Sequence, residues 1–269
     1  MKPPEPQVYV HVVQVEFAPD IKIPRAIQDE IVKSEAGKMH EEDADSDYLK
    51  DVAAEVAEVS VRGSLQSAGY FRVLADAKAT VLKTKGQDID VVVTVSAEPG
   101  NQYRTGEIEF KDADPDRALA YSPETLRTLI PLRPGDLLDV DAIRKGLRDL
   151  TNLYGTEGYI DMTAEPEFKF DEATKIIDMT IRVDEQKQYR IREIEFWGAR
   201  PQVERQLKES FQKSGEVFDK SRMEQFIKKN LTLLPPDAAA DQLLSIRRDA
   251  FTGMVDIVFD LQTCPGTGL

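Results

Sequence analysis

The feature that most constrains the fold is a short segment that occurs twice. It reads YRTGEIEF at 103–110 and YRIREIEF at 189–196, identical at six of eight positions. In both copies Ile and Phe alternate with Glu, which is the two-residue period of a strand with one buried face. A strand that recurs within one chain typically opens a repeated structural unit. The repeat therefore predicts a tandem array of small, similar units.

The segment that follows the first copy shows what one unit contains. YSPETLRTLIPLRPGD predicts a short helix that begins after Ser122 and ends near Pro131. DVDAIRKGLRDLTNLYGTEGY predicts a second helix with one apolar stripe, ending at Gly155. MTAEPEFKF and IIDMTIRVD alternate like strands and are separated by the turn DEAT. The unit is therefore predicted to be βααββ, closing with a hairpin.

The same order of elements recurs before and after this segment. After the second copy, SGEVFD at 214–219 matches PGDLLD at 134–139, and QLLSIRR and MVDIVFDLQ form the closing hairpin. The first unit is more diverged, and its opening strand VYVHVVQVEF is expected to bury His11, Val13, Val15 and Phe17.

We predict an α+β fold of three tandem two-layer βααββ units, each a three-stranded mixed sheet covered by two helices. The predicted boundaries are 7–100, 101–187 and 188–263, with tails at 1–6 and 264–269.

Composition excludes several function classes. The 269 residues carry a net charge of −14, which disfavours nucleic acid as a partner. No apolar run is long enough for a membrane-spanning helix. The single cysteine, Cys264, excludes an internal disulfide framework. Two histidines and no zinc, nucleophile or phosphate-loop motif predict a chain with no catalytic, cofactor-binding or metal-binding residues.

Acidic residues gather in three places that invite a functional interpretation. The run HEEDADSD, His40–Asp47, is expected to be a solvated loop between helices. Its two other interpretations are a metal site, although it lacks the spacing of a calcium-binding EF-hand loop, and an electrostatic contact with a basic partner. The pairs Glu107/Glu109 and Glu193/Glu195 are expected on solvated strand faces, because no histidine or cleft signal accompanies them.

At this level of detail the chain resembles a known family. YRTGEIEF, LRTLIPLRPGD, LRDLTNLYGTEGYID and IIDMTIRVDE, running into YRIREIEF, are similar to the polypeptide-transport-associated (POTRA) domain. Such domains form the periplasmic arm of outer-membrane barrel assembly and secretion proteins. The repeated motif positions are the Gly–aromatic pairs and the turn glycines: Gly69, Tyr70, Gly158, Tyr159, Gly135 and Gly215. The third unit departs from the family at NLTLLPPDAAAD, where the Gly–aromatic pair is absent.

The resemblance implies a non-enzymatic module that binds polypeptides at exposed sheet edges in outer-membrane protein assembly or translocation. Its implied partners are unfolded outer-membrane polypeptides or accessory assembly proteins, and a β-barrel of the same or another chain is a further candidate. Neither nucleic acid nor a direct membrane span is implied, and the implied location is the periplasm, at the outer membrane. Two alternatives stay open: a spacer or adaptor that binds one folded partner, and an enzyme that uses surface carboxylates.

Family topology implies that the first strand of each closing hairpin lies at a sheet edge. These strands are expected at Val73–Lys83, Met162–Phe170 and Gln242–Arg248. Pro166 blunts the second edge, because proline donates no backbone hydrogen bond. The candidate client-binding residues are therefore in units one and three: Val73, Ala75, Ala77, Ala79, Val81, Gln242, Leu244, Ile246 and Arg248.

The two ends add two expectations. The start MKPPEPQVYV lacks the apolar segment of a secretory signal, so the sequence itself does not indicate a compartment. Full-length family members continue into a β-barrel, whereas this chain stops at Leu269. It is expected to be either an isolated arm or an arm from which the barrel was removed.

Overall fold

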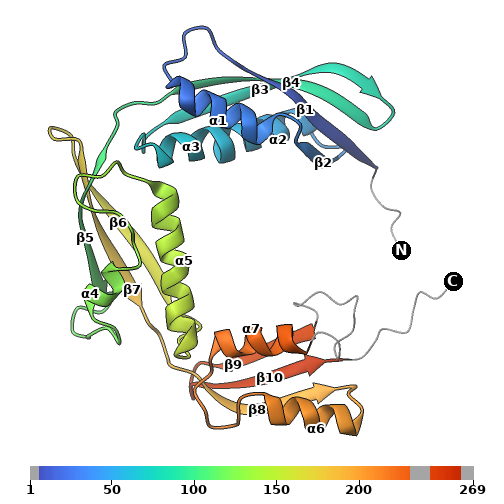
Figure 1. The fold of residues 1–269 in the computed structure, drawn as a ribbon, viewed down its shortest axis with the longest axis vertical. Coiled ribbons are helices and arrows are strands. Elements are labelled where there is room, and N and C mark those ends of the chain that lie inside the picture. Colours follow the sequence, from blue (N-terminus) through green and yellow to red (C-terminus); the bar gives the residue numbers. More distant parts are fainter. Residues whose placement is uncertain (1–5, 231–242, 262–269) are drawn as a thin grey trace. The chain divides into compact units, whose positions relative to one another are not determined.

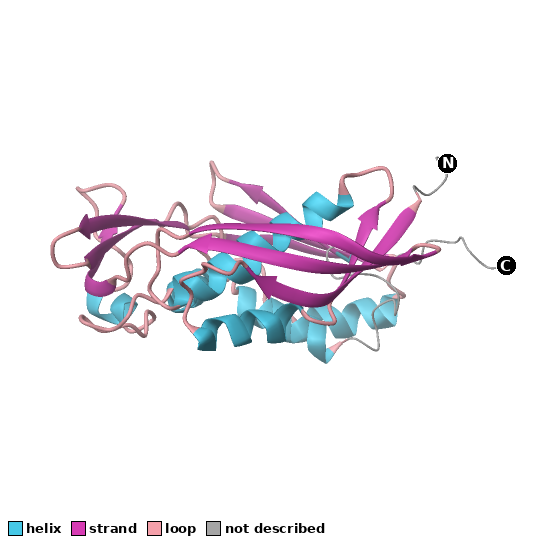
Figure 2. Cartoon of the chain, turned by 90° about the horizontal axis from the view of Figure 1, so that it is seen from above, coloured by secondary structure: helices cyan, strands magenta, loops and turns pink. Residues whose placement is uncertain are grey.

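The computed structural model describes residues 6–230 and 243–261, which form two compact units. The first comprises the chain up to Glu107 together with Ile130–Lys145 and Phe168–Met179. The second comprises Ile108–Leu129, Gly146–Glu167 and the chain from Thr180 onward. Both contain mixed sheets with helices packed on them (Figure 1), and Figure 2 separates helices from strands by colour. The α+β class is confirmed, whereas the predicted domain boundaries stay a prediction.

The first sheet and its helices occupy the N-terminal part of the chain. The elements are β1 (Gln7–Phe17), α1 (Arg25–Glu35), β2 (Met39–Asp43), α2 (Tyr48–Glu55), the π-helical stretch η1 (Val56–Val61), α3 (Arg62–Ser67), β3 (Leu74–Lys85) and β4 (Asp88–Glu98). The strand order is β2-β1-β4-β3 (Figure 1), and central β4 runs parallel to β1 and antiparallel to β3. The alternating valines of β4 are fully buried, as its sequence predicts.

This sheet has four strands, and the prediction of three was wrong for it. The acidic run expected to be a loop begins with β2, which pairs antiparallel with β1 from Gln7↔Asp43 to His11↔Met39. Backbone hydrogen bonds to the free side of β1 hold β2 in place, and such pairing requires no alternation of apolar residues. An acid-rich sequence can therefore form an edge strand without the signal that marks an interior strand.

The prediction for the buried face of β1 was wrong over half of the strand. Val10, Val12 and Val15 are buried, whereas Val13 is 46% exposed. The pairing of β1 with β4 shifts register between Val12 and Gln14. Such a bulge adds one residue to one strand, so the side chains before and after it exchange faces. His11 therefore lies outside the core, with Nε2 2.9 Å from Asp88 Oδ1.

The second sheet has the three strands predicted for it. Its elements are β5 (Arg104–Asp112), α4 (Pro123–Arg127), α5 (Val140–Thr156), β6 (Thr163–Asp171) and β7 (Ile176–Asp184), with strand order β5-β7-β6. Ser122 caps α4 by accepting the Thr125 N–H, and Pro123 occupies the first turn, as predicted. The inward residues of β7 are buried: Ile177, Met179, Ile181 and Val183.

A buried polar contact fastens α5 to the segment that follows β7. The Tyr154 hydroxyl donates to Glu185 Oε1 at 2.7 Å, and the Ala120 N–H donates to the same oxygen at 2.7 Å. Both side chains are at least nine-tenths buried. Burial and the hydrogen bond to Glu185 raise the pKa of Tyr154 well above its ordinary value. The Tyr154 hydroxyl is therefore a hydrogen-bond donor at all physiological pH values.

Tyr154→Phe is expected to lower the free energy of unfolding by about 1–2 kcal/mol, because it leaves the buried Glu185 carboxyl with one partner fewer. Urea denaturation followed by circular dichroism measures this loss. Tyr159→Phe is the matched control, since the structure gives the half-buried Tyr159 ring a contact with Tyr154 rather than a hydrogen bond to Glu185. Equal losses in the two variants would contradict the prediction.

The third sheet completes the described chain. Its elements are β8 (Arg190–Trp197), α6 (Pro201–Ser210), α7 (Lys220–Lys229), β9 (Leu244–Asp249) and β10 (Met254–Asp260), with strand order β8-β10-β9. Phe259 lies at the centre of its core and contacts the rings of Phe196, Phe211 and Phe226. No helix in the described segments is both long and apolar enough to span a membrane.

Candidate functional site

The longest exposed sheet edge in the first unit is β3. The strand has 12 residues, of which all but Leu82 pair with β4 on one side, and among the described residues no strand pairs with its other side. Leu74 is 64% exposed and Leu82 is 61% exposed, whereas Ala79 is buried. The expected edge Val73–Lys83 therefore lies here, although Val73 is buried before the strand begins.

Backbone geometry shows which β3 residues face the open side. The Ala18 N–H donates to the Val95 carbonyl, so the polar groups of Val95 point toward the β1 side of the sheet. Val95 lies opposite Ala77 in the antiparallel register, and because the polar groups of Val95 point away from β3, the two form a non-hydrogen-bonded pair, in which both residues turn their N–H and C=O groups away from each other. Ala77 therefore points its N–H and C=O to the open side, as do Ala75 and Ala79 two residues away.

The far end of β3 is protected against indiscriminate pairing. Its register with β4 shifts between Val81 and Lys83, so Val81 is the last residue before an irregularity. Lys83 and Lys85 follow and are exposed. Bulges and lysines are the usual devices by which proteins prevent edge-to-edge aggregation. The open backbone groups that suit a partner strand are therefore those of Ala75, Ala77 and Ala79.

A groove of about 800 Å³ lies at the start of β3. Leu74 and Ala75 of the strand line it together with Tyr70, Ile21 and Lys22. The groove thus places apolar side chains beside the first open backbone groups of the edge. Sequence reasoning did not predict the contribution of Ile21 and Lys22, because no periodic pattern marks how a loop packs against a strand.

In the second unit, β9 is a shorter edge. The Leu261 N–H donates to the Trp197 carbonyl, so by the same alternation Leu244 and Ile246 point their backbone groups away from β10. Arg248 shares this orientation, but its guanidinium donates to Asp161 at 2.6 Å. Gln242 lies outside the described residues.

The third expected edge, Met162–Phe170, corresponds to β6, an outer strand of the second sheet. Pro166 is at its centre and donates no backbone hydrogen bond. In the first unit, the rings of Phe168 and Phe170 pack against Phe71 at centroid distances of 4.8 and 5.6 Å. Part of this strand's apolar face is therefore already covered.

The repeated Tyr–Arg of the sequence forms a joint with the preceding helix end, first seen at Tyr103. Its N–H donates to the Gly69 carbonyl, and its hydroxyl donates to Glu172. Gln102 also donates to Ala68, and Leu138 donates to the Tyr103 carbonyl. Hydrogen bonds from Tyr103 and Lys175 hold the pKa of Glu172 below its ordinary value.

The same contacts recur at Tyr189 in the second unit. Its N–H donates to the Gly158 carbonyl, and its hydroxyl donates to Asp161 at 2.6 Å. This hydrogen bond is the main cause that raises the pKa of Tyr189 to about 12. Gln188 donates to Glu157, and Phe218 donates to the Tyr189 carbonyl, each matching a bond of the first joint. The repeated string therefore encodes a joint built twice.

The predicted motif glycines belong to these joints or to the turns beside them. Gly69 and Gly158 have φ of +90° and +81°, and a Cβ on Gly158 would lie 2.7 Å from the Tyr189 carbonyl oxygen. Gly135 and Gly215 have similar φ values, and the space around them is open. The first pair therefore needs glycine for space as well as conformation, whereas the second needs it for conformation alone.

The acidic pairs lie on strand faces, as expected. Glu107 and Glu109 are exposed on β5, and Glu109 forms an ion pair with Lys111. On β8, Glu193 is exposed and Glu195 accepts a hydrogen bond from Trp197. In the described part of the chain these carboxylates show no arrangement with a histidine that would support acid–base catalysis.

Comparison with known proteins agrees with this architecture. The POTRA family model, described as "Surface antigen variable number repeat", matches residues 103–186. A putative outer membrane protein assembly factor of Treponema pallidum is 26% identical over 225 residues, which are 81% of this chain and 25% of the relative. The crystal structure of POTRA domains 3–5 of Haemophilus influenzae BamA aligns with a TM-score of 0.65 at 17% identity, covering 97% of this chain and 99% of that one.

These comparisons show the fold. The chain spans about a quarter of the length of the assembly factor that it matches. Both matches are to POTRA domains, which are non-enzymatic binding modules. Residues 103–186 match the POTRA family model, and the whole chain has the fold of a tandem of POTRA-like units, as in BamA POTRA domains 3–5.

Proposed function

We propose that the chain acts in the periplasm, in outer-membrane protein assembly or translocation, and binds extended polypeptide segments that add a strand to β3. The open backbone groups of Ala75, Ala77 and Ala79 carry this proposal. Main-chain hydrogen bonds provide affinity whatever side chains the client brings, which suits a module that serves many clients. The groove beside Leu74 would receive an apolar client side chain at the start of the added strand.

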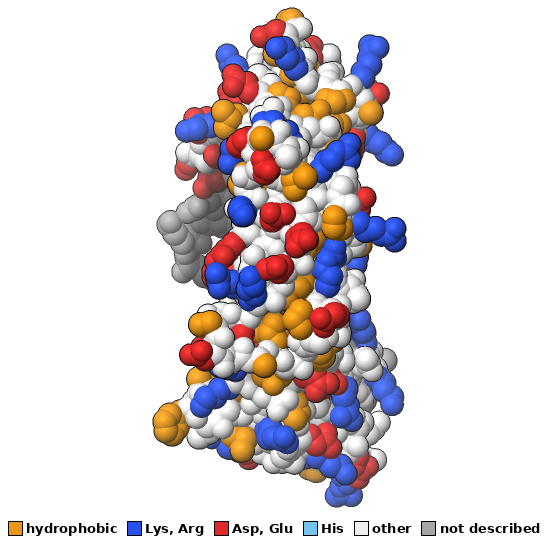
Figure 3. Space-filling model, turned by 90° about the vertical axis from the view of Figure 1, so that its left-hand side faces the viewer, with side chains coloured by type: hydrophobic (Ala, Val, Ile, Leu, Met, Phe, Trp, Pro, Cys, Tyr) orange, Lys and Arg blue, Asp and Glu red, His pale blue; other side chains and the backbone are white. Residues whose placement is uncertain are grey.

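The surface chemistry is consistent with recognition through the main chain. On the face drawn in Figure 3, acidic and basic side chains are interspersed and apolar side chains form small separate patches. A mixed surface of this kind does not select one sign of charge in a partner. The similarity to an outer membrane protein assembly factor supports the proposed clients, namely unfolded outer-membrane polypeptides, and accessory assembly proteins as further partners.

Hydrogen–deuterium exchange with an added client peptide tests where the segment binds. Protection is expected over 75–81, because those amides would donate to the new strand. A second site at β9 would protect 244–248. Protection confined to β6, around Met162–Phe170, would refute the assignment to β3.

Ala77→Pro is expected to weaken client binding at least about tenfold, because it removes an outward N–H and places a ring in the path of the added strand. The β3–β4 ladder does not use this N–H, so the sheet is expected to stay folded. Ala77→Ser keeps the N–H and is the matched control. Fluorescence anisotropy of a labelled client peptide measures both variants, and equal affinities for the two would contradict the proposal.

The alternative function is a spacer or adaptor that docks one folded protein. An aggregation assay separates the two functions. Suppressed aggregation of an unfolded barrel protein, lost in Ala77→Pro, supports client binding. A tight complex with one folded protein that is indifferent to Ala77→Pro, without any effect on aggregation, supports the adaptor.

A further inference from the structure

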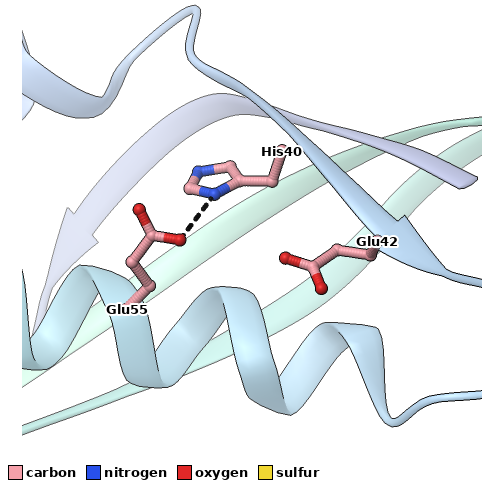
Figure 4. A group of neighbouring side chains, drawn as sticks. All are labelled: His40, Glu42 and Glu55. Carbon is pink, nitrogen blue, oxygen red and sulfur yellow. Dashed lines mark hydrogen bonds and ion pairs between the residues drawn. The ribbon is translucent and has the colours of Figure 1, made fainter. Parts of the chain in front are cut away.

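Strand β2 brings a histidine and two glutamates from separate elements together. His40 is 6% exposed, and its Nδ1 lies 3.1 Å from Oε2 of Glu55, which belongs to α2. Glu42 lies two residues after His40 and therefore on the same face of β2. One ligand atom of each of the three side chains lies within 4.8 Å of the others, and Figure 4 shows both carboxylates on the Nδ1 side of the ring.

The other ring nitrogen of His40 provides a second observation. Nε2 is buried and has no hydrogen-bond partner, although Glu35 Oε2 lies 4.0 Å away. That oxygen is also buried without a partner, in a side chain that is 2% exposed. Histidines that bind metal through one nitrogen usually direct the other N–H to a carboxylate. Glu35 is placed to accept this N–H when Nδ1 is the ligand.

The charges around His40 leave room for a cation. Lys38 is the positive side chain at this place, with Nζ 3.0 Å from Glu55 and 3.5 Å from Glu35. The carboxylates of Glu35, Glu42 and Glu55 therefore carry more negative charge than the Lys38 ammonium group balances.

We propose that His40, Glu42 and Glu55 bind one divalent transition-metal ion of the zinc type, through His40 Nδ1 and one oxygen of each glutamate. One imidazole and two carboxylates form a donor set that suits Zn²⁺ and leaves one position for water. Ligand atoms around tetrahedral zinc are about 3.3 Å apart. His40 Nδ1 and Glu55 Oε2 are already 3.1 Å apart, so only the longer separations, which are at most 4.8 Å, must shorten, by up to about 1.5 Å. Both glutamate side chains are half-buried and at the surface, where rotation about χ angles allows this movement.

The bound ion would join β2 to α2. Two ligands are on an edge strand that is otherwise fastened mainly through its backbone pairing with β1, and the third is on the helix. The ion would thus fix the β2 edge of the first sheet to the helix α2. This proposal concerns β2, whereas client binding is assigned to β3, so each is testable without the other.

Isothermal titration of the chain with ZnCl₂ tests the site, in a Cys264→Ser background that removes the only thiol. We expect one ion per chain, an increase in melting temperature with Zn²⁺, and no such increase with Mg²⁺ at equal concentration. His40→Gln and Glu42→Gln should each weaken binding at least tenfold, and Glu35→Gln about tenfold. Glu42→Gln alters a half-buried side chain and keeps the test valid if His40→Gln fails to fold.

Two control variants should leave zinc affinity unchanged, and a third variant should increase it. Glu41→Gln alters the exposed neighbour on the other face of β2, and His11→Gln removes the remaining histidine, so neither should change zinc affinity. Lys38→Met removes the competing positive charge and should tighten binding several-fold. Absence of saturable binding, or equal affinity in Glu42→Gln and Glu41→Gln, would overturn the proposal.

Discussion

Phe259→Ala is expected to destabilise the third sheet by about 3–5 kcal/mol, the range typical of a buried phenylalanine truncated in a core. Phe259 is 1% exposed, stacks on Phe196 at 4.9 Å and meets Phe211 and Phe226 edge-on or tilted. Its removal leaves three rings facing a cavity that the β8–β10 pairing prevents from collapsing. Urea denaturation followed by the fluorescence of Trp197, the only tryptophan, measures the loss in this sheet.

Phe251→Ala is the matched control for this substitution. Phe251 lies in the β9–β10 turn and is 90% exposed. Lys187 donates to its backbone carbonyl, and that bond survives truncation of the ring. We expect a change within about 0.5 kcal/mol, as for surface substitutions in general. Comparable losses at the two positions would show that the aromatic core does not stabilise the sheet as described.

Gly158→Ala is expected to cost about 3 kcal/mol or more of unfolding free energy at the joint with β8. The residue has a positive φ, which costs about 1–2 kcal/mol for an L-residue other than glycine. Its new Cβ would also lie 2.7 Å from the Tyr189 carbonyl oxygen and 2.9 Å from Val217. The backbone oxygen cannot move without disturbing the bond that Tyr189 accepts from Phe218, so the two costs add.

Gly215→Ala separates strain from crowding. Gly215 has nearly the same φ, and nothing lies within 4 Å of a Cβ added to it. Its expected cost is therefore the conformational share alone, about 1–2 kcal/mol. The Trp197 fluorescence midpoint in urea measures both variants. If Gly215→Ala proved as damaging as Gly158→Ala, the close approach to Tyr189 would not be what fixes the joint.

Much of the fold could be predicted because most strands bury a single face. The alternation in β4, β5, β7 and β10 identifies their inward residues correctly, since each of these strands packs against helices on that face. The string YR-EIEF predicted a strand at both places, and both strands form; in each copy the tyrosine N–H bonds the carbonyl of the glycine that follows the preceding helix. Local chemistry of this kind is readable from sequence alone.

The remaining features depend on contacts between distant residues. The bulge at Val12–Gln14 changes the buried face of β1 without a proline or glycine to mark it. Strand β2 forms because β1 has a free side, which no property of MHEED reveals. The group around His40 was missed for the same reason, since Glu55 joins it only once α2 packs beside β2. A histidine within an acid-rich strand two residues before Glu42 was the only local signal.

Strand β2 also sets how many partners the first sheet can accept. A three-stranded sheet presents two open sides, and a protein with two open sides can join copies of itself end to end without limit. With β2 seated on β1, the sheet ends on that side in a five-residue strand whose sequence is largely acidic. At the opposite edge lies β3, the long outer strand to which a further strand can add. The first sheet is therefore expected to accept one added strand, at β3. A module built in this way can hold a client strand without becoming the template for a polymer.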